Sequence, residues 1–164
     1  MLIKADNSCL LVIDIQEKLV PAVYQNQQLI DNCKWLIEVA GIVEVPILTS
    51  EQYPRGLGGT VSELDQLLPA SGKMDKLHFS CASDKSCIEK IRATERNQIV
   101  IVGMEAHVCV LQTALELLAS GKEVFVVADA VSSRNPDDKE LALARMRQSG
   151  VQVVSREMVA FEWL

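Results

Sequence analysis

The stretch Gln98-Ile-Val-Ile-Val-Gly-Met-Glu-Ala-His-Val-Cys-Val-Leu-Gln-Thr-Ala-Leu115 changes its hydrophobic pattern halfway along. Ile99 to Val102 form a short β-branched run, which predicts a strand buried on both faces. After Gly103 the apolar residues recur at helical spacing, which predicts a helix that begins around Cys109 and stops at Gly121. This pattern places one cysteine where a strand turns into a helix.

A thiol in the first turn of a helix lies near unpaired backbone N–H groups and the positive end of the helix dipole. Both favour the thiolate over the thiol, so the sequence makes Cys109 a candidate nucleophile. The alternative is a buried cysteine that only fills the core.

Length and composition limit the class of protein. The 164 residues are 49% hydrophobic and 23% charged, which predicts one globular domain over residues 1–164. A formal charge of −6 and the lack of a Lys/Arg cluster argue against nucleic acid as a partner. The N-terminus has no signal-peptide pattern, and no apolar run reaches the roughly 18 residues of a membrane helix, so we expect no membrane partner and a cytoplasmic location.

The cysteines do not form a recognisable framework. Their number is odd and their spacing fits neither a zinc ribbon nor a CxxC redox motif, so we expect mostly buried free thiols. The five are Cys9, Cys33, Cys81, Cys87 and Cys109.

Strands alternate with helices along the chain. The apolar run 8–16 predicts a central parallel strand, 29–40 a helix and 45–50 a second strand, which together make a β-α-β unit. The expected elements that follow are a long irregular segment at 51–73, a short edge element or loop at 76–81, strands at 123–128 and 151–154, a polar loop at 129–136, and helices at 83–92, 137–148 and 156–164. The order predicts an α/β fold, a Rossmann-like three-layer α/β/α sandwich with a mainly parallel sheet.

Ligands of such sheets bind beyond the carboxyl ends of the strands, where the strand order reverses. Asp14 ends one predicted central strand and Cys109 follows another, so the two meet if the strands are neighbours. The carboxylate would then accept the thiol proton, and Lys76 would favour the thiolate electrostatically. Taken alone, Asp14 could equally be a turn cap and Lys76 a solvated surface charge.

Three separated motifs give a more specific signal: Val-Ile-Asp-Ile-Gln at 12–16, Lys-Leu-His-Phe-Ser at 76–80, and Gly-Met-Glu-Ala-His-Val-Cys-Val at 103–110. Together they resemble the isochorismatase-like cysteine hydrolases over almost the whole chain. The segments 50–58 and 128–134 are most similar to isochorismatase domain-containing proteins of unassigned substrate. The resemblance implies a Rossmann-like fold and a catalytic triad of Asp14, Lys76 and Cys109.

The resemblance also implies details of the site. The peptide bond between Met104 and Glu105 would be cis and would direct backbone N–H groups, including that of Cys109, toward an oxyanion. The predicted pocket walls are Tyr53, Leu57, Phe79, His107 and Val108.

One departure from the relatives bears on metal binding. Nicotinamidases of this superfamily carry an Asp-x-His and a further His that bind a metal, whereas the corresponding loop here is Glu51-Gln-Tyr53. We therefore expect no metal and no other cofactor. A metal site built on the distant pair His78 and His107 is the less favoured alternative.

These observations predict a hydrolase of a small-molecule substrate, an amide or related carbonyl compound, that works through thiolate attack and a thioester intermediate. A catalytically silent oligomeric binding or scaffold protein is the alternative from another class, and a nicotinamidase or isochorismatase is the alternative among enzymes. Relatives commonly assemble, so we also expect a homo-oligomer, a dimer or larger.

Overall fold

Six parallel strands form one central sheet in the computed structural model, which describes residues 1–164. Their order across the sheet is β3-β2-β1-β4-β5-β6, and every neighbouring pair is parallel. The strands are β1 (Ser8–Ile13), β2 (Ile47–Gln52), β3 (Lys73–Lys76), β4 (Gln98–Met104), β5 (Glu123–Ser132) and β6 (Gln152–Val154). The predicted α/β sandwich is confirmed, with a wholly parallel sheet.

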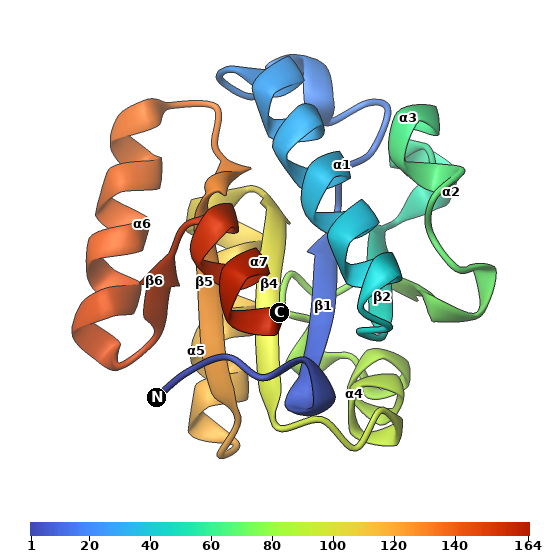
Figure 1. Ribbon diagram of the computed structural model, residues 1–164. Helices are drawn as coiled ribbons and strands as arrows, with labels where there is room; N and C mark the ends of the chain where they lie inside the picture. The colour runs from blue at the N-terminus through green and yellow to red at the C-terminus, as the bar shows by residue number, and fades with distance from the viewer.

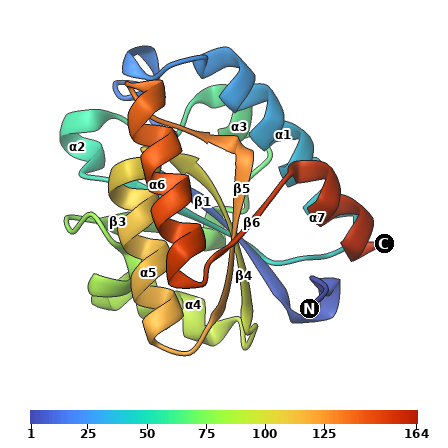
Figure 2. The ribbon, with the colours of Figure 1, turned by 90° about the vertical axis from the view of Figure 1, so that its left-hand side faces the viewer.

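Helices cover both faces of the sheet (Figure 1). Figure 2 shows α1 and α7 on one side, and α4, α5 and α6 on the other. The helices are α1 (Asn26–Ile42), α2 (Pro54–Leu57), α3 (Ser62–Asp65), α4 (Lys85–Ala93), α5 (Leu111–Ala119), α6 (Pro136–Ser149) and α7 (Arg156–Trp163). None of them is both long and apolar enough to cross a membrane.

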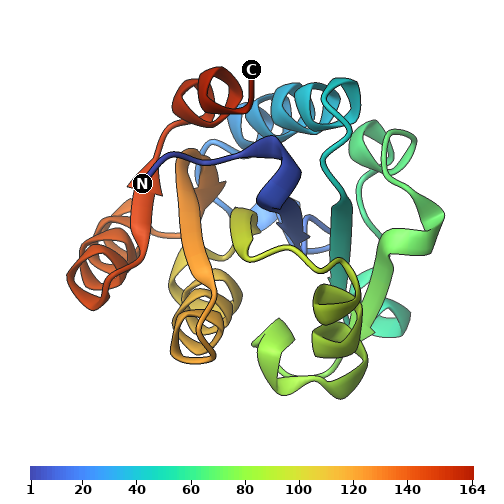
Figure 3. The same cartoon turned by 60° about the horizontal axis from the view of Figure 1, so that its bottom comes forward.

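The core consists of two clusters of buried side chains, one on each face of the sheet. All six residues of β1 are buried, and alternate residues contribute to opposite clusters. Leu10 packs with α1 and α7, whereas Leu11 packs with α4, α5 and α6. The two layers of helices lie on opposite sides of the strands in Figure 3. Burial on both faces explains why β1 reads as a continuous apolar run.

The polar loop predicted at 129–136 is partly wrong, because β5 continues to Ser132. The pairing of β5 with β4 shifts register between Ile101 and Gly103, and Val131 then pairs with Gly103. Asp129 lies exposed in the shifted segment, where one carboxylate oxygen accepts a bond from the N–H of Arg156 at 2.9 Å. This irregularity removes the apolar periodicity from which a strand is recognised.

The helix predicted to begin around Cys109 begins differently. A π-helical turn, Ala106–Val110, precedes α5 and contains Cys109. The N–H of Val110 donates to the carbonyl of Glu105, five residues earlier, at 3.2 Å, which is the hydrogen bond that defines a π-helix. Such turns occur often at functional sites. The helix stops before Gly121, as predicted, and that glycine has φ +95°.

The strand order reverses between β1 and β4, which makes their carboxyl ends the topological switch point. Gly103 is required here, because a Cβ atom at this position would lie 2.1 Å from the carbonyl oxygen of Ile13 and its φ is +124°. The two strands therefore approach each other closely just before Asp14 on one and the cysteine-bearing turn on the other.

Candidate active site

Asp14, Lys76 and Cys109 come together at the switch point. Asp14 directly follows β1 and has φ 52°, a left-handed conformation that Asp tolerates better than most residues. Lys76 is the last residue of β3 and reaches across the end of β2, so that its Nζ lies 2.8 Å from Asp14 Oδ2. The same Nζ lies 3.6 Å from Cys109 Sγ. One ammonium therefore contacts both a carboxylate and a thiol.

The charges at this centre are almost fully removed from solvent. The side chain of Lys76 is 0% exposed and that of Asp14 is 3% exposed. The ammonium also donates to Gln52 Oε1 at 2.6 Å and to the carbonyl of His78 at 3.2 Å. Ser50 Oγ donates to Asp14 Oδ1 at 2.8 Å. These bonds satisfy both buried charges and fix their positions.

The electrostatics of Cys109 differ from the sequence-based expectation of a favoured thiolate. Burial, followed by the Asp14 carboxylate, raises the pKa of the Cys109 thiol above its ordinary value, and the Lys76 ammonium only partly opposes them. Burial and the facing carboxylate thus favour the thiol over the thiolate. The expectation was wrong because a helix-dipole argument from sequence contains neither the burial nor the facing carboxylate.

The pKa values of the two partners are also raised. Burial raises the pKa of Asp14 despite the opposing Lys76 charge, which makes this carboxylate a stronger proton acceptor than an exposed aspartate. Burial, the largest single effect, lowers the pKa of Lys76, but the opposing effects of Asp14, Cys109 and Cys81 together exceed it, so that the pKa of the lysine is raised. The arrangement can hold an ammonium beside a carboxylate that faces a protonated thiol.

A cavity of about 270 Å³ opens onto Cys109. Its walls are mostly apolar. Three of the predicted wall residues, Leu57, Phe79 and Val108, line it together with Asp14, Leu19, Ala22, Gln52, Met104, Glu105, Cys109 and Arg134. The volume suits a small molecule rather than a polymer segment.

Two predicted wall residues do not line the cavity. Tyr53 directly precedes α2 and has φ 39°. Its ring lies over Gly56, where an added Cβ would be 2.3 Å from it, and the residue lines a separate surface pocket. His107 does not line the cavity; its Nδ1 lies 2.9 Å from Ser133 Oγ and its Nε2 lies 3.9 Å from Asp138 Oδ2. Neither residue contributes to this cavity, because the local backbone, which proximity in sequence does not reveal, determines where each side chain lies.

Gln52 and Arg134 line the cavity but were not predicted to do so. Gln52 belongs to a turn-rich segment without periodicity, and an amide side chain has no sequence signal of its own. Arg134 lies in a segment shared with the relatives, which was the one available clue.

The peptide bond between Met104 and Glu105 is cis, at the position where the resemblance places one. It lies between β4 and the π-helical turn that carries Cys109. Both residues line the cavity together with Cys109, so this bond lies in the part of the wall that includes the candidate nucleophile.

Glu51, which stands where nicotinamidases have a metal-binding aspartate, already has partners within the chain. Its Oε2 accepts bonds from the Thr60 N–H at 2.5 Å and from Thr60 Oγ1 at 2.7 Å. The carboxylate is buried and fastens the segment after β2. Its observed role in this chain is therefore structural.

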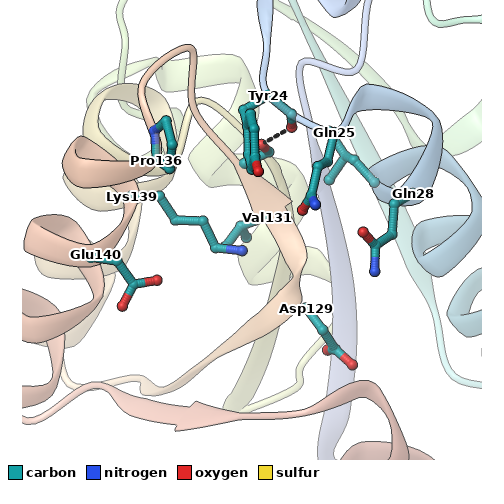
Figure 4. A pocket seen from close by; sticks show the side chains of 10 residues that line it. Tyr24, Gln25, Gln28, Asp129, Val131, Pro136, Lys139 and Glu140 are labelled. Atoms are coloured by element: carbon teal, nitrogen blue, oxygen red, sulfur yellow. Dashed lines mark hydrogen bonds between the residues drawn. The ribbon is translucent and has the colours of Figure 1, made fainter.

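A second cavity, of about 230 Å³, lies away from Cys109 between α1 and α6 (Figure 4). Lys139 points into it from one side, and Gln25 and Gln28 lie on the other. Its serine, Ser132, donates its hydroxyl to the carbonyl of Tyr24 at 2.6 Å. The cavity contains no cysteine or histidine, so the candidate chemistry belongs to the first cavity.

Comparisons with known proteins agree with this geometry. The isochorismatase domain model matches residues 8–158. Isochorismatase domain-containing protein 2 of Danio rerio is 38% identical over 157 residues, covering 94% of this chain and 78% of the relative.

Solved structures of similar fold include two that cover 99% of the chain. MAR1 ribonuclease from Caenorhabditis elegans has 36% identity, a TM-score of 0.92 and 83% of its own chain covered. The Escherichia coli YcaC gene product, an octameric hydrolase of unknown specificity, has 25% identity, a TM-score of 0.94 and 82% of its own chain covered. From the fold, the matched domain and these relatives, this chain belongs to the isochorismatase domain family.

Proposed function

We propose that this protein is a cysteine-dependent hydrolase of a small molecule that carries an amide or a related carbonyl group. The observation that carries the proposal is the contact of one buried ammonium, Lys76 Nζ, with both Asp14 and Cys109 at the wall of an apolar cavity. Membership of a family that includes hydrolases supports it.

In the proposed reaction the resting thiol of Cys109 gives its proton to Asp14 as Sγ attacks the substrate carbonyl carbon. Lys76 stabilises the negative charge that appears on sulfur. Backbone N–H groups beside the cis peptide bond, including that of Cys109, bind the oxyanion of the tetrahedral intermediate.

The intermediate then collapses to a thioester. The carbon–nitrogen bond breaks, and the proton held by Asp14 passes to the leaving amine. A water molecule, deprotonated by the same carboxylate, attacks the thioester and releases the acid and the thiol. As the carbon–sulfur bond breaks, Asp14 returns this proton to the Cys109 sulfur, so it acts as base, acid, base and acid in turn.

Ammonia release from a panel of primary amides tests this proposal. Cys109→Ala is expected to retain the fold and abolish hydrolysis, because no other side chain in the cavity can form the thioester. Cys33→Ala is the matched control, since it removes a buried thiol from the opposite face of the sheet. Equal hydrolysis by wild type and Cys109→Ala rules the mechanism out.

One relative is a ribonuclease, so RNA belongs in the same panel. The net charge of −6 and the small apolar cavity favour a small molecule over a polyanion. RNA cleavage that persists in Cys109→Ala would indicate another active surface. We further propose a homo-oligomeric state, on the strength of the octameric YcaC relative.

A further inference from the structure

Arg134 is the only cationic side chain that lines the Cys109 cavity. It lies at the carboxyl end of the sheet, two residues beyond β5. Its Nε lies 3.1 Å from Glu105 Oε1, and its backbone N–H donates to the same oxygen at 2.9 Å. Glu105 follows the cis peptide bond, so Arg134 is tethered to the wall beside the candidate nucleophile.

This tether uses only one edge of the guanidinium group. The side chain has five N–H donors, of which Nε–H is bound by Glu105. The Nη1 and Nη2 atoms have no partner within the chain, and the side chain is 65% exposed. A ligand can therefore reach a pair of parallel donors on a side chain that is tethered through its Nε.

The other polar groups of the cavity are already engaged. Asp14 is bound by Lys76 and Ser50, and Gln52 Oε1 accepts from Lys76, so both belong to the end where the carbonyl would react. The remaining walls of the cavity are mostly apolar, with Leu57, Phe79 and Val108 among them. The cavity thus combines the groups of the reacting centre, mostly apolar walls and one cationic side chain.

We propose that Arg134 binds a carboxylate on the substrate, so that the substrate class is an amide or related carbonyl compound with an apolar body and an anionic end. This inference rests on the proposed function for the reacting end. A carboxylate matches the two parallel Nη donors, which a lysine ammonium does not reproduce.

The charge of Glu105 bears on this assignment. A single oxygen, Oε1, makes both bonds to Arg134, on the Nε edge of the guanidinium. The carboxylate of a ligand therefore approaches the opposite edge, where it is separated from Glu105 by the cation. Glu105 partly neutralises the charge of Arg134, and the arginine side chain is exposed. We therefore expect a moderate selectivity for the carboxylate over the neutral amide, which falls as salt is added.

A matched pair of electrophiles tests the proposal: N-chloroacetylglycine and N-chloroacetylglycinamide. Both form the same bond between Cys109 Sγ and the chloroacetyl carbon, with loss of chloride and of the thiol proton, and they differ only in the anionic or neutral end. The measured quantity is the rate of alkylation of Cys109 by the anionic reagent divided by that by the neutral reagent, determined by peptide mass spectrometry. This ratio is then divided by the same ratio for 2-mercaptoethanol, which corrects for intrinsic reactivity. A second pair, N-chloroacetyl-β-alanine and its amide, places the carboxylate one methylene farther from the reacting carbon.

In wild type the normalised ratio should exceed one for at least one pair, and Arg134→Gln should lower it roughly fivefold. Arg134→Lys should retain part of the preference. Arg145→Gln is the matched control, because it removes the same charge from an exposed position of α6 outside the cavity, and it should leave the ratio unchanged. A ratio that is equal in wild type and Arg134→Gln overturns the carboxylate site while leaving the nucleophile intact.

If the proposed function is wrong and Cys109 is not a nucleophile, neither reagent labels it, which is distinguishable from equal labelling ratios. Saturation-transfer NMR with benzoylglycine and benzoylglycinamide then decides on the carboxylate site independently of the reaction. Preferential binding of benzoylglycine by wild type and its loss in Arg134→Gln would support the site without the chemistry. Equal binding of both compounds by both proteins would overturn it.

Discussion

Lys76 supplies the buried positive charge that contacts both Asp14 and Cys109 in the candidate site. Its ammonium has the carboxylate of Asp14, an amide oxygen, a backbone carbonyl and the Cys109 sulfur as neighbours. Removing one partner of such a buried pair leaves the other uncompensated, so substitutions at Asp14 and Lys76 should act on Cys109 in opposite directions.

The first prediction concerns the pH dependence of Cys109 alkylation by iodoacetamide. The Asp14 carboxylate raises the pKa of the thiol and the Lys76 ammonium lowers it. Asp14→Asn should therefore lower the apparent pKa and speed alkylation at neutral pH, while Lys76→Met should raise the pKa and slow it. The rate at each pH, with the adduct located by mass spectrometry, gives both values.

The same variants separate reactivity from catalysis. Asp14→Asn should alkylate faster yet lose amide hydrolysis, because it lacks the base that accepts and returns the proton. The other four cysteines are fully buried and provide internal references for background labelling. If Asp14→Asn instead raises the pKa of Cys109, the carboxylate does not face the thiol as described.

At the scale of elements, the segment after β2 is held over the cavity by one buried amide. Gln16 Nε2 donates to the carbonyls of Gln52 and Gly58, at 2.9 and 2.8 Å, and its Oε1 accepts from the N–H of Gln52 at 2.6 Å. Gln52 in turn accepts from Lys76. This chain of bonds connects the end of β1 to the ammonium.

The second prediction is that Gln16→Ala loosens the segment 52–60 while the sheet stays folded. Three backbone groups lose their partner, at a cost of about 1–3 kcal/mol for each group that stays buried. Hydrogen exchange followed by mass spectrometry should show faster exchange in 52–60. Gln27→Ala, at an exposed position of α1, is the control. Unchanged exchange in 52–60 would mean that other contacts hold the segment.

The third prediction concerns the contact between β1 and β4. Gly103→Ala should lower the free energy of unfolding by at least about 2 kcal/mol, because the new Cβ meets the backbone of Ile13 and the φ of +124° is unfavourable for alanine. Urea unfolding measures the change.

Gly41→Ala is the matched control for this substitution. Gly41 lies within α1 and has no atom within 4 Å of an added Cβ, so alanine should raise the free energy of unfolding by about 0.5–1 kcal/mol. A Gly103→Ala protein as stable as wild type would contradict the close approach of the two strands.

At the scale of the whole molecule, much of the architecture follows from the sequence because the strands are buried on both faces. Continuous apolar runs such as 8–13 and 99–102 have no other stable place than the centre of a covered sheet. Alternation with helices then requires parallel pairing, and the reversal of strand order brings Asp14 and the turn of Cys109 to one edge.

The parts that could not be predicted depend on three-dimensional surroundings rather than on pattern. The pKa of Cys109 depends on burial and on a residue nearly a hundred positions away. The orientation of Tyr53 depends on a left-handed backbone, and the place of Arg134 in the cavity wall depends on the register shift that lengthens β5. Lys76 was predicted to act on the thiol, but taken alone it could be a surface charge, and its burial beside Asp14 follows only from the folded sheet.

The measurement that tests the central claim most directly is detection of the acyl-enzyme. After rapid mixing with p-nitrophenyl butyrate and an acid quench, the peptide that contains Cys109 should carry a butyryl group that hydroxylamine removes, as expected for a thioester. Cys109→Ala should show neither the adduct nor turnover. Hydrolysis that proceeds equally in Cys109→Ala, or an acyl group found on another residue, would contradict the assignment of Cys109 as the nucleophile.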